Sequence, residues 1–338
     1  FFTFFKQQLL FKNIIIHFLK KESQEKESAI IPRDSVLSVN PQTELLLEKI
    51  LKAYNAKTDK LYSSFDQQNS LFQSKLSGYL NDGADFVEFT SQAMALLKSE
   101  LDKSNLSTGG FIIFLHYTVS MTEFFMALMI NNSEGMKVDD QMNLDHTRYL
   151  DIGKLHLACR INLSEWALNQ QSDRYISFVK GKSPQKISDY FRNFIGIEEN
   201  DYNPKADNDN LVDALDNYSS QSELSIEEMQ ENKKKAYQYC QQQAKDGNLI
   251  ELNELSSAIN EASPKDFSDY IKAEPYSIEQ QLLPDRKSLR QILRYNGFSP
   301  GMRISFDKAL LGYSVFYDKN TDTLTIKGIP DNLRDQLT

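Results

Sequence analysis

The sequence predicts an α+β fold, because strand-like and helix-like segments occur in separate blocks. Strands come first, helices follow, strands return in the middle of the chain, and a helical region precedes a last block of strands. The regular strand–helix–strand alternation of a doubly wound parallel sheet is missing. Glycine and proline are sparse, at 13 and 9 of 338 residues, which disfavours a glycine-rich β-sandwich and long flexible linkers. We therefore expect a mixed or antiparallel sheet with helices in the N-terminal part, and a helical segment with a terminal β-hairpin in the C-terminal part.

The length suits one large domain or two ordinary ones. Hydrophobic residues make up 40% and aromatic residues 11% of the chain, which is enough to bury a sizeable core. Near residue 200 the composition changes to Asn, Asp, Gln and Glu. The predicted organisation is an upstream extension or artefact at 1–10, an α+β domain at 11–200, and a helical region ending in a β-hairpin at 201–338.

The elements of the N-terminal part follow from their hydrophobic periodicity. In chain order they are strands at 13–20 and 29–39, a helix after Asn40-Pro41, a helix near 84–102, strands at 111–119, 123–131, 154–163 and 174–179, and a helix at about 184–195. Strand 154–163 has the clearest alternation, with Leu157, Cys159 and Ile161 on one side and Arg160 on the other. This strand is predicted to have one core face and one polar, basic face.

Helix caps mark the elements of the C-terminal part. Ser225 and Glu228 form a capping-box pattern, Gly247 is a helix stop, and Ser263-Pro264 is predicted to begin a further helix. Another helix is expected at 286–295. The chain then returns to strands, in the segments MRISF, GYSVFYD and TLTIKG, with a turn at Lys319-Asn320-Thr321.

Two segments match the letters of catalytic sequence patterns but lack residues or elements that those patterns require. Gly297 to Gly301 fits G-x-S-x-G, but a nucleophile elbow needs a strand before the serine and an N–H after it, and Pro300 has no N–H. We expect a helix-to-strand turn there. Gly181-Lys182-Ser183 resembles the end of a P-loop, but Ile176 stands where the first glycine is required. Neither segment predicts an enzyme.

Metal and redox chemistry are weakly indicated. His17, His116, His146 and His156 have no metal-ligand spacing, and Cys159 and Cys240 suit small core residues of a reducing compartment. A group of aspartates could in principle hold Mg²⁺ in a nuclease, but a solvated loop with turn and cap aspartates is favoured: Asp139, Asp140, Asp145 and Asp151. No cofactor and no metal are expected.

Positive charge is gathered in two islands of an acidic chain. Lys and Arg number 38 against 47 Asp and Glu, a net charge of −9. Residues 148–192 carry eight basic and four acidic residues, and residues 286–303 carry five basic residues and no acid. The first island predicts a phosphate anchor where a strand passes into a helix that Ser183 caps. The second predicts a helix stripe of arginines at i, i+4 and i+8. The candidate DNA-binding residues are Arg160, Arg174, Lys180, Lys182, Lys186, Arg286, Arg290 and Arg294. An ordinary solvated surface is the alternative for either island.

Several phrases of the chain resemble one protein family in collinear order. They are GGFIIFLHY (109–117), RYLDI (148–152), RINLSEW (160–166), KGK (180–182), DRKSLRQ (285–291) and DTLTIKGIPDNLRDQL (322–337). The family is that of the bacterial nucleoid-associated proteins typified by YejK, also called NdpA. The resemblance runs from about Phe11 to Thr338, and none of its phrases is a catalytic signature.

The resemblance implies a cytoplasmic protein that associates with the nucleoid and binds DNA, with no reaction assigned. Together with the charge islands it predicts a non-enzymatic binder of double-stranded DNA that grips phosphates with little sequence dependence and acts in chromosome organisation. Single-stranded nucleic acid is a further possible partner, and a homodimer is expected because it would double the phosphate contacts. The alternatives are an adaptor that reaches the nucleoid through a basic DNA-bound protein, and a metal-dependent nuclease. The apolar opening is broken by Lys6 and Lys12, so no membrane association is expected.

Overall fold

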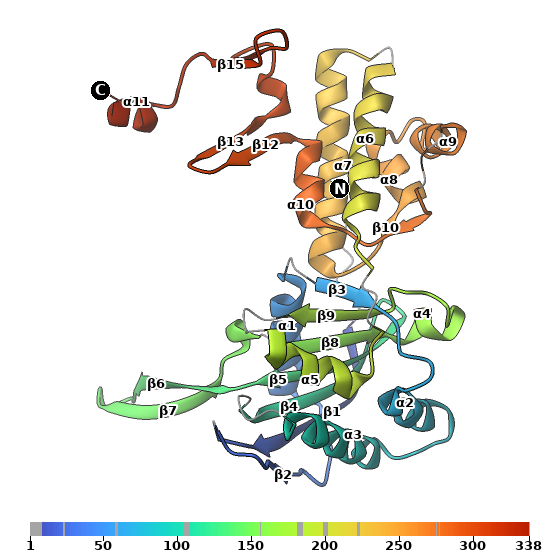
Figure 1. Cartoon of the computed structure of the whole chain (residues 1–338), viewed down its shortest axis with the longest axis vertical. Coiled ribbons are helices and arrows are strands. Elements are labelled where there is room, and N and C mark those ends of the chain that lie inside the picture. The colour runs from blue at the N-terminus through green and yellow to red at the C-terminus, as the bar shows by residue number, and fades with distance from the viewer. Residues whose placement is uncertain are drawn as a thin grey trace. The chain divides into compact units, whose positions relative to one another are not determined.

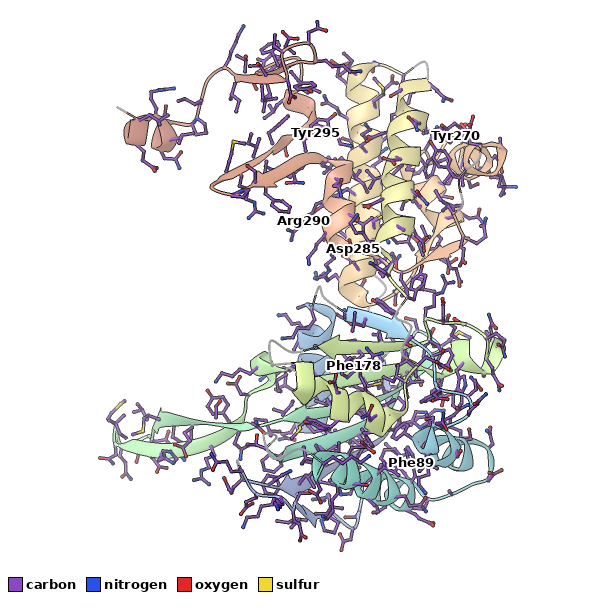
Figure 2. The ribbon with its side chains drawn as sticks, viewed as in Figure 1. Phe89, Phe178, Tyr270, Asp285, Arg290 and Tyr295 are labelled. Carbon is purple, nitrogen blue, oxygen red and sulfur yellow. The ribbon has the colours of Figure 1, made fainter. Side chains whose placement is uncertain are left out.

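The computed structural model describes residues 9–22, 24–57, 60–103, 108–155, 157–180, 185–198, 202–221, 224–274, 276 and 278–337, with the backbone alone at 180 and 185–188. The chain divides into two compact units, Phe1–Asn203 and Pro204–Thr338. The class is α+β, as predicted from the sequence (Figure 1). Figure 2 shows the side chains of both units in the same view.

Within the described residues, unit 1 is built on a seven-stranded antiparallel sheet. Its strand order is β2-β1-β4-β5-β8-β9-β3. The strands are β1 (Leu9–Lys20), β2 (Ala29–Ile31), β3 (Lys60–Ser63), β4 (Gly110–Val119), β5 (Thr122–Ile130), β8 (Leu157–Asn162) and β9 (Ile176–Lys180). A separate hairpin of β6 (Asn132–Val138) and β7 (Leu144–Leu150) extends beyond this sheet (Figure 1).

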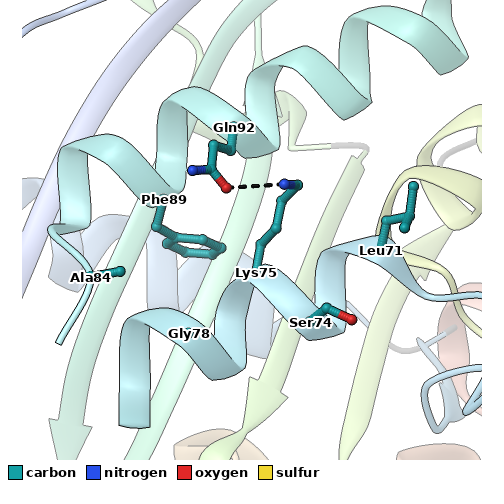
Figure 3. Close-up of a pocket in the computed structure, with 7 residues that line it drawn as sticks. All are labelled: Leu71, Ser74, Lys75, Gly78, Ala84, Phe89 and Gln92. Carbon is teal, nitrogen blue, oxygen red and sulfur yellow. Dashed lines mark hydrogen bonds between the residues drawn. The ribbon is translucent and has the colours of Figure 1, made fainter. Parts of the chain in front are cut away.

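Helices cover both faces of the sheet. The helices of unit 1 are α1 (Pro41–Asn55), α2 (Leu71–Asn81), α3 (Phe86–Leu101), α4 (Leu163–Leu168) and α5 (Gln185–Ile195), with a 3₁₀ turn η1 (Ile152–Lys154). The side chains of α2, α3, α4 and α5 pack in one hydrophobic cluster with one face of the sheet. Those of α1 pack with the opposite face in a second cluster. Helices α2 and α3 lie side by side, and Lys75 Nζ donates to Gln92 Oε1 at 3.0 Å (Figure 3).

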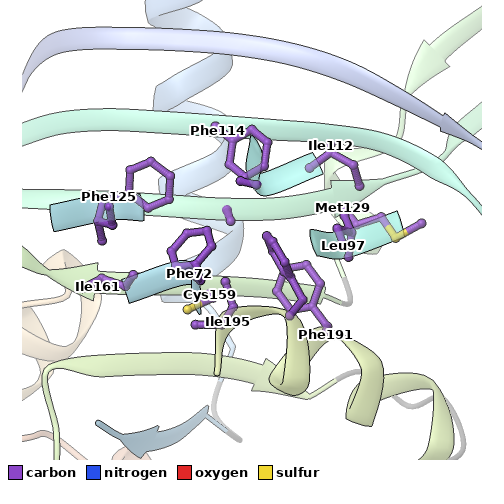
Figure 4. Close-up of a cluster of buried hydrophobic side chains, with 14 of the residues drawn as sticks. Phe72, Leu97, Ile112, Phe114, Phe125, Met129, Cys159, Ile161, Phe191 and Ile195 are labelled. Atoms are coloured by element: carbon purple, nitrogen blue, oxygen red, sulfur yellow. The ribbon is translucent and has the colours of Figure 1, made fainter. Parts of the chain in front are cut away.

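Alternation along the strands divides the core between the two faces. In β4, Ile112 and Phe114 belong to the cluster beneath α3, whereas Ile113 and Leu115 belong to the cluster beneath α1. Figure 4 shows the first cluster, in which aromatic rings fill the space between sheet and helices. The Phe72 ring meets the Phe194 ring edge-on, at 5.1 Å between centroids. Since both faces are apolar, β4 and β5 read as nearly continuous hydrophobic runs.

Unit 2 begins with a helical body. Its elements are α6 (Lys205–Gln221), α7 (Ile226–Asp246), β10 (Ile250–Glu251), α8 (Leu252–Ile259), α9 (Asp266–Ala273), β11 (Gln281–Leu282), α10 (Arg286–Leu289) and the 3₁₀ turn η2 (Arg290–Ile292). The capping box of Ser225 with Glu228 and the left-handed Gly247 at the end of α7 are confirmed. The predicted cap at Ser263-Pro264 is wrong, because the Ser263 carbonyl accepts the Asp266 N–H in a turn and α9 begins at Asp266.

The end of unit 2 carries two hairpins. They are β12 (Arg294–Ser299) with β13 (Met302–Asp307), and β14 (Val315–Asp318) with β15 (Thr323–Ile326), separated by the 3₁₀ turn η3 (Lys308–Leu310) and followed by α11 (Asp331–Leu337). The hairpin expected at the end of the chain is β14–β15. The predicted helix at 286–295 is wrong, because α10 ends at Leu289 and Arg294 already belongs to β12.

Two further expectations for unit 1 are corrected. The strand expected at 29–39 stops at Ile31, because Pro32 has no N–H for the sheet and the chain returns to β1 only where Leu37 N–H donates to the Ile14 carbonyl. The solvated loop expected around Asp139 to Asp151 is largely the β6–β7 hairpin. Asp139 and Asp140 lie at its tip, Asp145 belongs to β7, and Asp151 follows β7.

Candidate nucleic-acid interface

Arg160 does not lie on an open sheet face. The predicted polar face of its strand is covered by α1, so that expectation is wrong. The Arg160 guanidinium lies 5.1 Å from the ring centroid of Tyr54 in α1 and 4.9 Å from that of Phe124 in β5. Burial alone would lower the pKa of Arg160, but the nearby hydroxyls of Tyr117 and Tyr54 outweigh it and raise that pKa. The guanidinium is thus a charged group enclosed by aromatic rings.

Arg174 is also engaged inside unit 1. Its side chain is largely buried, and its Nε lies 3.5 Å from Glu165 Oε1. The guanidinium also lies 6.0 Å from the ring centroid of Tyr202. Arg174 therefore joins α4 to the segment after α5.

The predicted anchor falls between the end of β9 and the beginning of α5. Lys180 is the last residue of β9 and pairs with Leu157 of β8. Lys182 and the expected cap Ser183 lie outside the described residues, and α5 begins at Gln185, one residue before Lys186. The strand-to-helix transition is confirmed, whereas the cap and the lysine side chains stay predictions.

The sheet brings further lysines to this end of β9. β3 pairs with β9, and Lys60 stands opposite Val179, next to Lys180. The end of α1 lies near Lys60, because Lys60 Nζ donates to the Asn55 carbonyl at 3.5 Å, and Lys57 follows that helix. We call Lys57, Lys60 and Lys180 the basic edge. Lys57 and Lys60 are not among the residues predicted from the sequence, because they stand about 120 residues before β9 and only strand pairing places them near Lys180.

The second island is a helix end followed by a strand. Arg286, Arg290 and Arg294 therefore do not form one helical stripe, and that prediction is wrong. Arg286 Nη2 donates to the Ala244 carbonyl at 3.0 Å, near the end of α7. Arg294 pairs with Asp307 across the β12–β13 hairpin at 2.9 Å.

Two arginines of this region have exposed side chains. The side chains of Arg290 and Arg303 form no hydrogen bond or ion pair with the part of the chain that the structure describes. Arg290 is labelled in Figure 2 beside α10. Segment 286–306 contains five basic residues and no acid. Arg303 was absent from the candidate residues because it falls outside the helical spacing expected for the island.

The segments that resemble catalytic motifs have structural roles where they are described. Gly297 to Gly301 runs along β12 into the turn before β13, so the expected helix-to-strand turn is wrong. A nucleophile elbow leads into a helix, whereas this serine is followed by a hairpin turn and a second strand. Asp139 accepts N–H bonds from Gln141 and Asn143 in the β6–β7 turn. Among the described residues, no three His, Cys, Asp or Glu side chains are grouped as metal ligands.

A buried hydrogen-bond chain joins four elements of unit 1. Tyr79 Oη lies 2.7 Å from His116 Nδ1, and His116 Nε2 lies 2.6 Å from Glu123 Oε1. Burial raises the pKa of Tyr79, and burial lowers the pKa of His116 despite the carboxylate beside it. Asn13 of β1 donates to the same tyrosine oxygen at 2.9 Å. The network ties α2 to β1, β4 and β5, and its carboxylate also pairs with Lys12 of β1.

A shallow pocket of about 330 Å³ lies between α2 and α3 (Figure 3). The lining residues are Leu71, Ser74, Lys75, Gly78, Ala84, Phe89 and Gln92. Its one charged group, Lys75, already donates to Gln92. The lining thus offers no acid–base pair and no nucleophile with a base beside it.

Several known proteins similar to this chain are named as nucleoid-associated proteins. This chain is 38% identical over 328 residues to a "Nucleoid-associated protein" of Azotobacter vinelandii, covering 96% of this chain and 97% of the relative. It is 39% identical over 330 residues to a protein of the same name from Pseudomonas putida, with 96% and 98% covered. These similarities define the class of the chain as bacterial nucleoid-associated proteins. Within that class, residues 15–334 match the family model described as nucleoid-associated protein YejK, and the chain belongs to this family.

The family expected from the sequence is therefore confirmed. In the described part of the chain, none of the helices is long and apolar enough to cross a membrane.

Proposed function

We propose that this chain is a non-enzymatic DNA-binding protein that holds duplex DNA through its phosphates, with little dependence on sequence, and contributes to chromosome organisation in the cytoplasm. Membership of a nucleoid-associated family supports the setting. The acid-free segment 286–306, with the exposed Arg290 and Arg303, is the observation that carries the proposal. Phosphate contacts position a protein on DNA without reading its bases.

The proposed contacts fall on both units. In unit 1 they are the basic edge together with Lys182 and Lys186. In unit 2 they are Arg290 and Arg303. Four of the predicted residues already contact other parts of the chain: Arg160, Arg174, Arg286 and Arg294. We propose that they hold neighbouring elements in place and do not bind phosphates directly.

Charge elsewhere in unit 2 restricts how DNA approaches. Residues 204–285 contain 7 basic and 17 acidic residues. A polyanion is repelled by this helical body and attracted by segment 286–306. The chain is therefore expected to bind duplex DNA in a limited set of orientations and to release it readily as salt rises.

A salt titration of duplex affinity with the purified chain tests the proposal. Each phosphate contact contributes a slope of about −0.9 to the plot of log affinity against log salt for B-DNA. The Lys180/Lys182/Lys186→Ala triple variant is expected to reduce the magnitude of this slope by about 3. A matched control replaces three exposed lysines elsewhere, Lys26, Lys234 and Lys245, by alanine. Salt-insensitive affinity, or unchanged affinity in the first variant, contradicts the proposal.

An adaptor role is the second candidate, and the acidic body at 204–285 favours it. In that case the chain binds a basic DNA-associated protein and makes no DNA contact of its own. A gel shift at moderate salt separates the two functions, because the adaptor gives no shifted band with purified components.

We also propose a homodimer, since two copies double the phosphate contacts and allow two duplexes to be bridged. Light scattering that finds only monomer at micromolar concentration contradicts this. Competition between duplex and single-stranded DNA of equal length shows which form the chain prefers.

A further inference from the structure

The β12–β13 hairpin is a narrow two-stranded ribbon with two different faces. Cross-strand pairs place Arg294 opposite Asp307, Asn296 opposite Ser305 and Phe298 opposite Arg303 on one face. Tyr295, Ile304 and Phe306 lie on the other, with the Tyr295 and Phe306 rings 5.4 Å apart. One face of the ribbon is therefore polar along its stem.

The stem of the ribbon is held in place. Arg294 pairs with Asp307 at 2.9 Å, and Ser305 Oγ donates to Asn296 Oδ1 at 2.6 Å. Lys308, directly after β13, pairs with Asp216 of α6, which connects the stem to the helical body. These bonds leave little freedom at the base of the ribbon, so its tip has a defined direction within unit 2.

The tip ends in a tight turn. Ser299 pairs with Met302, so Pro300 and Gly301 form a two-residue loop. Gly301 has φ 80°, the left-handed value that the third position of a type II turn requires, and proline suits the position before it. Pro300, whose ring restricts φ, and the left-handed Gly301 together give the turn a defined backbone conformation.

An aromatic side chain near this tip is almost fully exposed. Phe298 is 92% exposed, and Met302, on the other face of the ribbon, is 58% exposed. Phe298 lies on the polar face, directly opposite the exposed guanidinium of Arg303. Phe298 and Arg303 place an apolar ring next to a cation on a segment without acidic residues. This pair is complementary to a partner that has both stacked aromatic groups and negative charges. Duplex DNA has this combination, because its base pairs lie between two rows of phosphates.

We propose that the β12–β13 ribbon enters a groove of duplex DNA and that the Phe298 ring inserts between two base pairs as a wedge, while Arg303 binds an adjacent phosphate. This inference rests on the proposed DNA binding and adds a mechanical effect to it. Apolar wedges of this kind partly unstack a base step and kink the duplex by about 20–90°. The chain then bends DNA in addition to holding it.

The test measures bending, unstacking and affinity on one short duplex. Dyes on the two ends report bending by energy transfer, and 2-aminopurine in the duplex reports unstacking by its fluorescence. The wild-type chain is expected to raise both signals. The Phe298→Ala variant is expected to lose most of both changes, while affinity falls no more than about tenfold and the salt slope stays the same, because the phosphate contacts remain.

Two further variants keep the test specific. Phe298→Trp retains a large ring and is expected to keep both signals. Tyr313→Ala removes another aromatic side chain of unit 2, 83% exposed, and is expected to behave as the wild type.

Three results overturn the wedge. The first is bending by Phe298→Ala equal to that of the wild type. The second is tight wild-type binding without a 2-aminopurine response, in which case the proposed DNA binding stands and the wedge falls. The third is a wild-type dimer that Phe298→Ala converts to monomer, together with a loss of bending that only follows the loss of binding. In that case the Phe298 ring belongs to a contact between two copies of the chain. Absence of any duplex binding instead removes the proposed function and the wedge with it.

Discussion

The guanidinium of Arg160 lies 5.1 Å from the ring centroid of Tyr54, although the two residues are 106 positions apart in sequence. Lys60 Nζ lies 5.0 Å from the centroid of the same ring. The tyrosine hydroxyl donates to Ser177 Oγ at 2.7 Å. One buried aromatic side chain therefore joins α1, β3, β8 and β9, and two cations share it.

This arrangement predicts that Arg160→Ala lowers stability rather than DNA affinity. A desolvated cation–π contact contributes up to about 2 kcal/mol, and Arg160 has two such contacts. We expect the free energy of unfolding to fall by about 2–3 kcal/mol, as measured by urea denaturation at pH 7. At a temperature where the variant is folded, its duplex affinity is expected to change by less than about threefold. A stable variant with a large loss of affinity contradicts this and makes Arg160 a direct contact.

Asn208 predicts a second stability effect, in unit 2. Its side-chain amide donates to the carbonyls of Pro204 and Leu283, both at 2.7 Å, and its Oδ1 accepts the Asp285 N–H at 3.0 Å. Asn208→Ala leaves the Leu283 carbonyl and the Asp285 N–H without this partner, whereas the Pro204 carbonyl keeps its bond from the backbone N–H of residue 208. The expected cost is about 3 kcal/mol in the unfolding of unit 2. The control is Asn217→Ala, which removes an exposed amide of the same helix. Similar melting curves for the two variants refute the role assigned to Asn208.

His17 predicts how stability depends on pH. Its Nδ1 accepts the Arg33 N–H at 3.1 Å, so the ring proton is on Nε2, which lies 3.1 Å from Thr90 Oγ1. Burial lowers the pKa of His17 to about 4 from its usual 6.5. As pH falls, the imidazole of the unfolded chain is protonated at a higher pH than the imidazole of the folded chain. The neutral ring therefore contributes its full stability above pH 6.5, and this contribution is lost progressively between pH 6.5 and pH 4.

The loss expected over that interval is on the order of 3 kcal/mol. Urea unfolding of the wild type and of His17→Gln at a series of pH values measures it, because shared carboxylate effects cancel in the difference between the two. We expect the variant to be less stable at pH 7 and the two curves to converge toward pH 4. A constant difference across that range shows that His17 does not titrate as inferred.

The exposed arginines of segment 286–306 predict changes in salt dependence. Arg290→Ala and Arg303→Ala are each expected to lower the log–log salt slope of duplex binding by about 1 and to weaken binding similarly on every sequence. Arg334→Ala in α11 is the matched control, because Arg334 pairs with Asp331 at 2.8 Å. Fluorescence anisotropy at four or five salt concentrations provides the slopes. If the control lowers the slope as much as the other two, the effect belongs to net charge alone.

Local signals in the sequence predicted much of the fold. β4 and β5 follow from long apolar runs, and α7 follows from its capping box and its final glycine. The second strand of the ribbon was predicted in the segment MRISF, but the first was not. The spacing of Leu289, Ile292 and Leu293 continues a helical pattern that the pairing of Arg294–Ser299 with Met302–Asp307 overrides. Such pairing depends on two segments together, and neither segment alone indicates it.

The candidate site was predicted less completely. The charge pattern of the sequence indicates both islands, but it does not distinguish a guanidinium enclosed by rings, as in Arg160, from one in solvent, as in Arg303. The basic edge depends on the pairing of β3 with β9, which no local pattern reveals. The division of the chain near residue 200 into independently folding domains stays a prediction.

The pairing of β3 with β9 also sets the timing of biosynthesis. Lys60 is paired with Val179, which leaves the ribosome 119 residues later. At about 5–20 residues per second, β3 waits roughly 6–24 s for the strand beside it. During that interval the nascent chain exposes the sheet-facing side of α1, including Tyr54, until β8 and β9 arrive. Chaperone contact during synthesis is therefore expected to concentrate on α1 and β3 and to end once Lys180 has emerged.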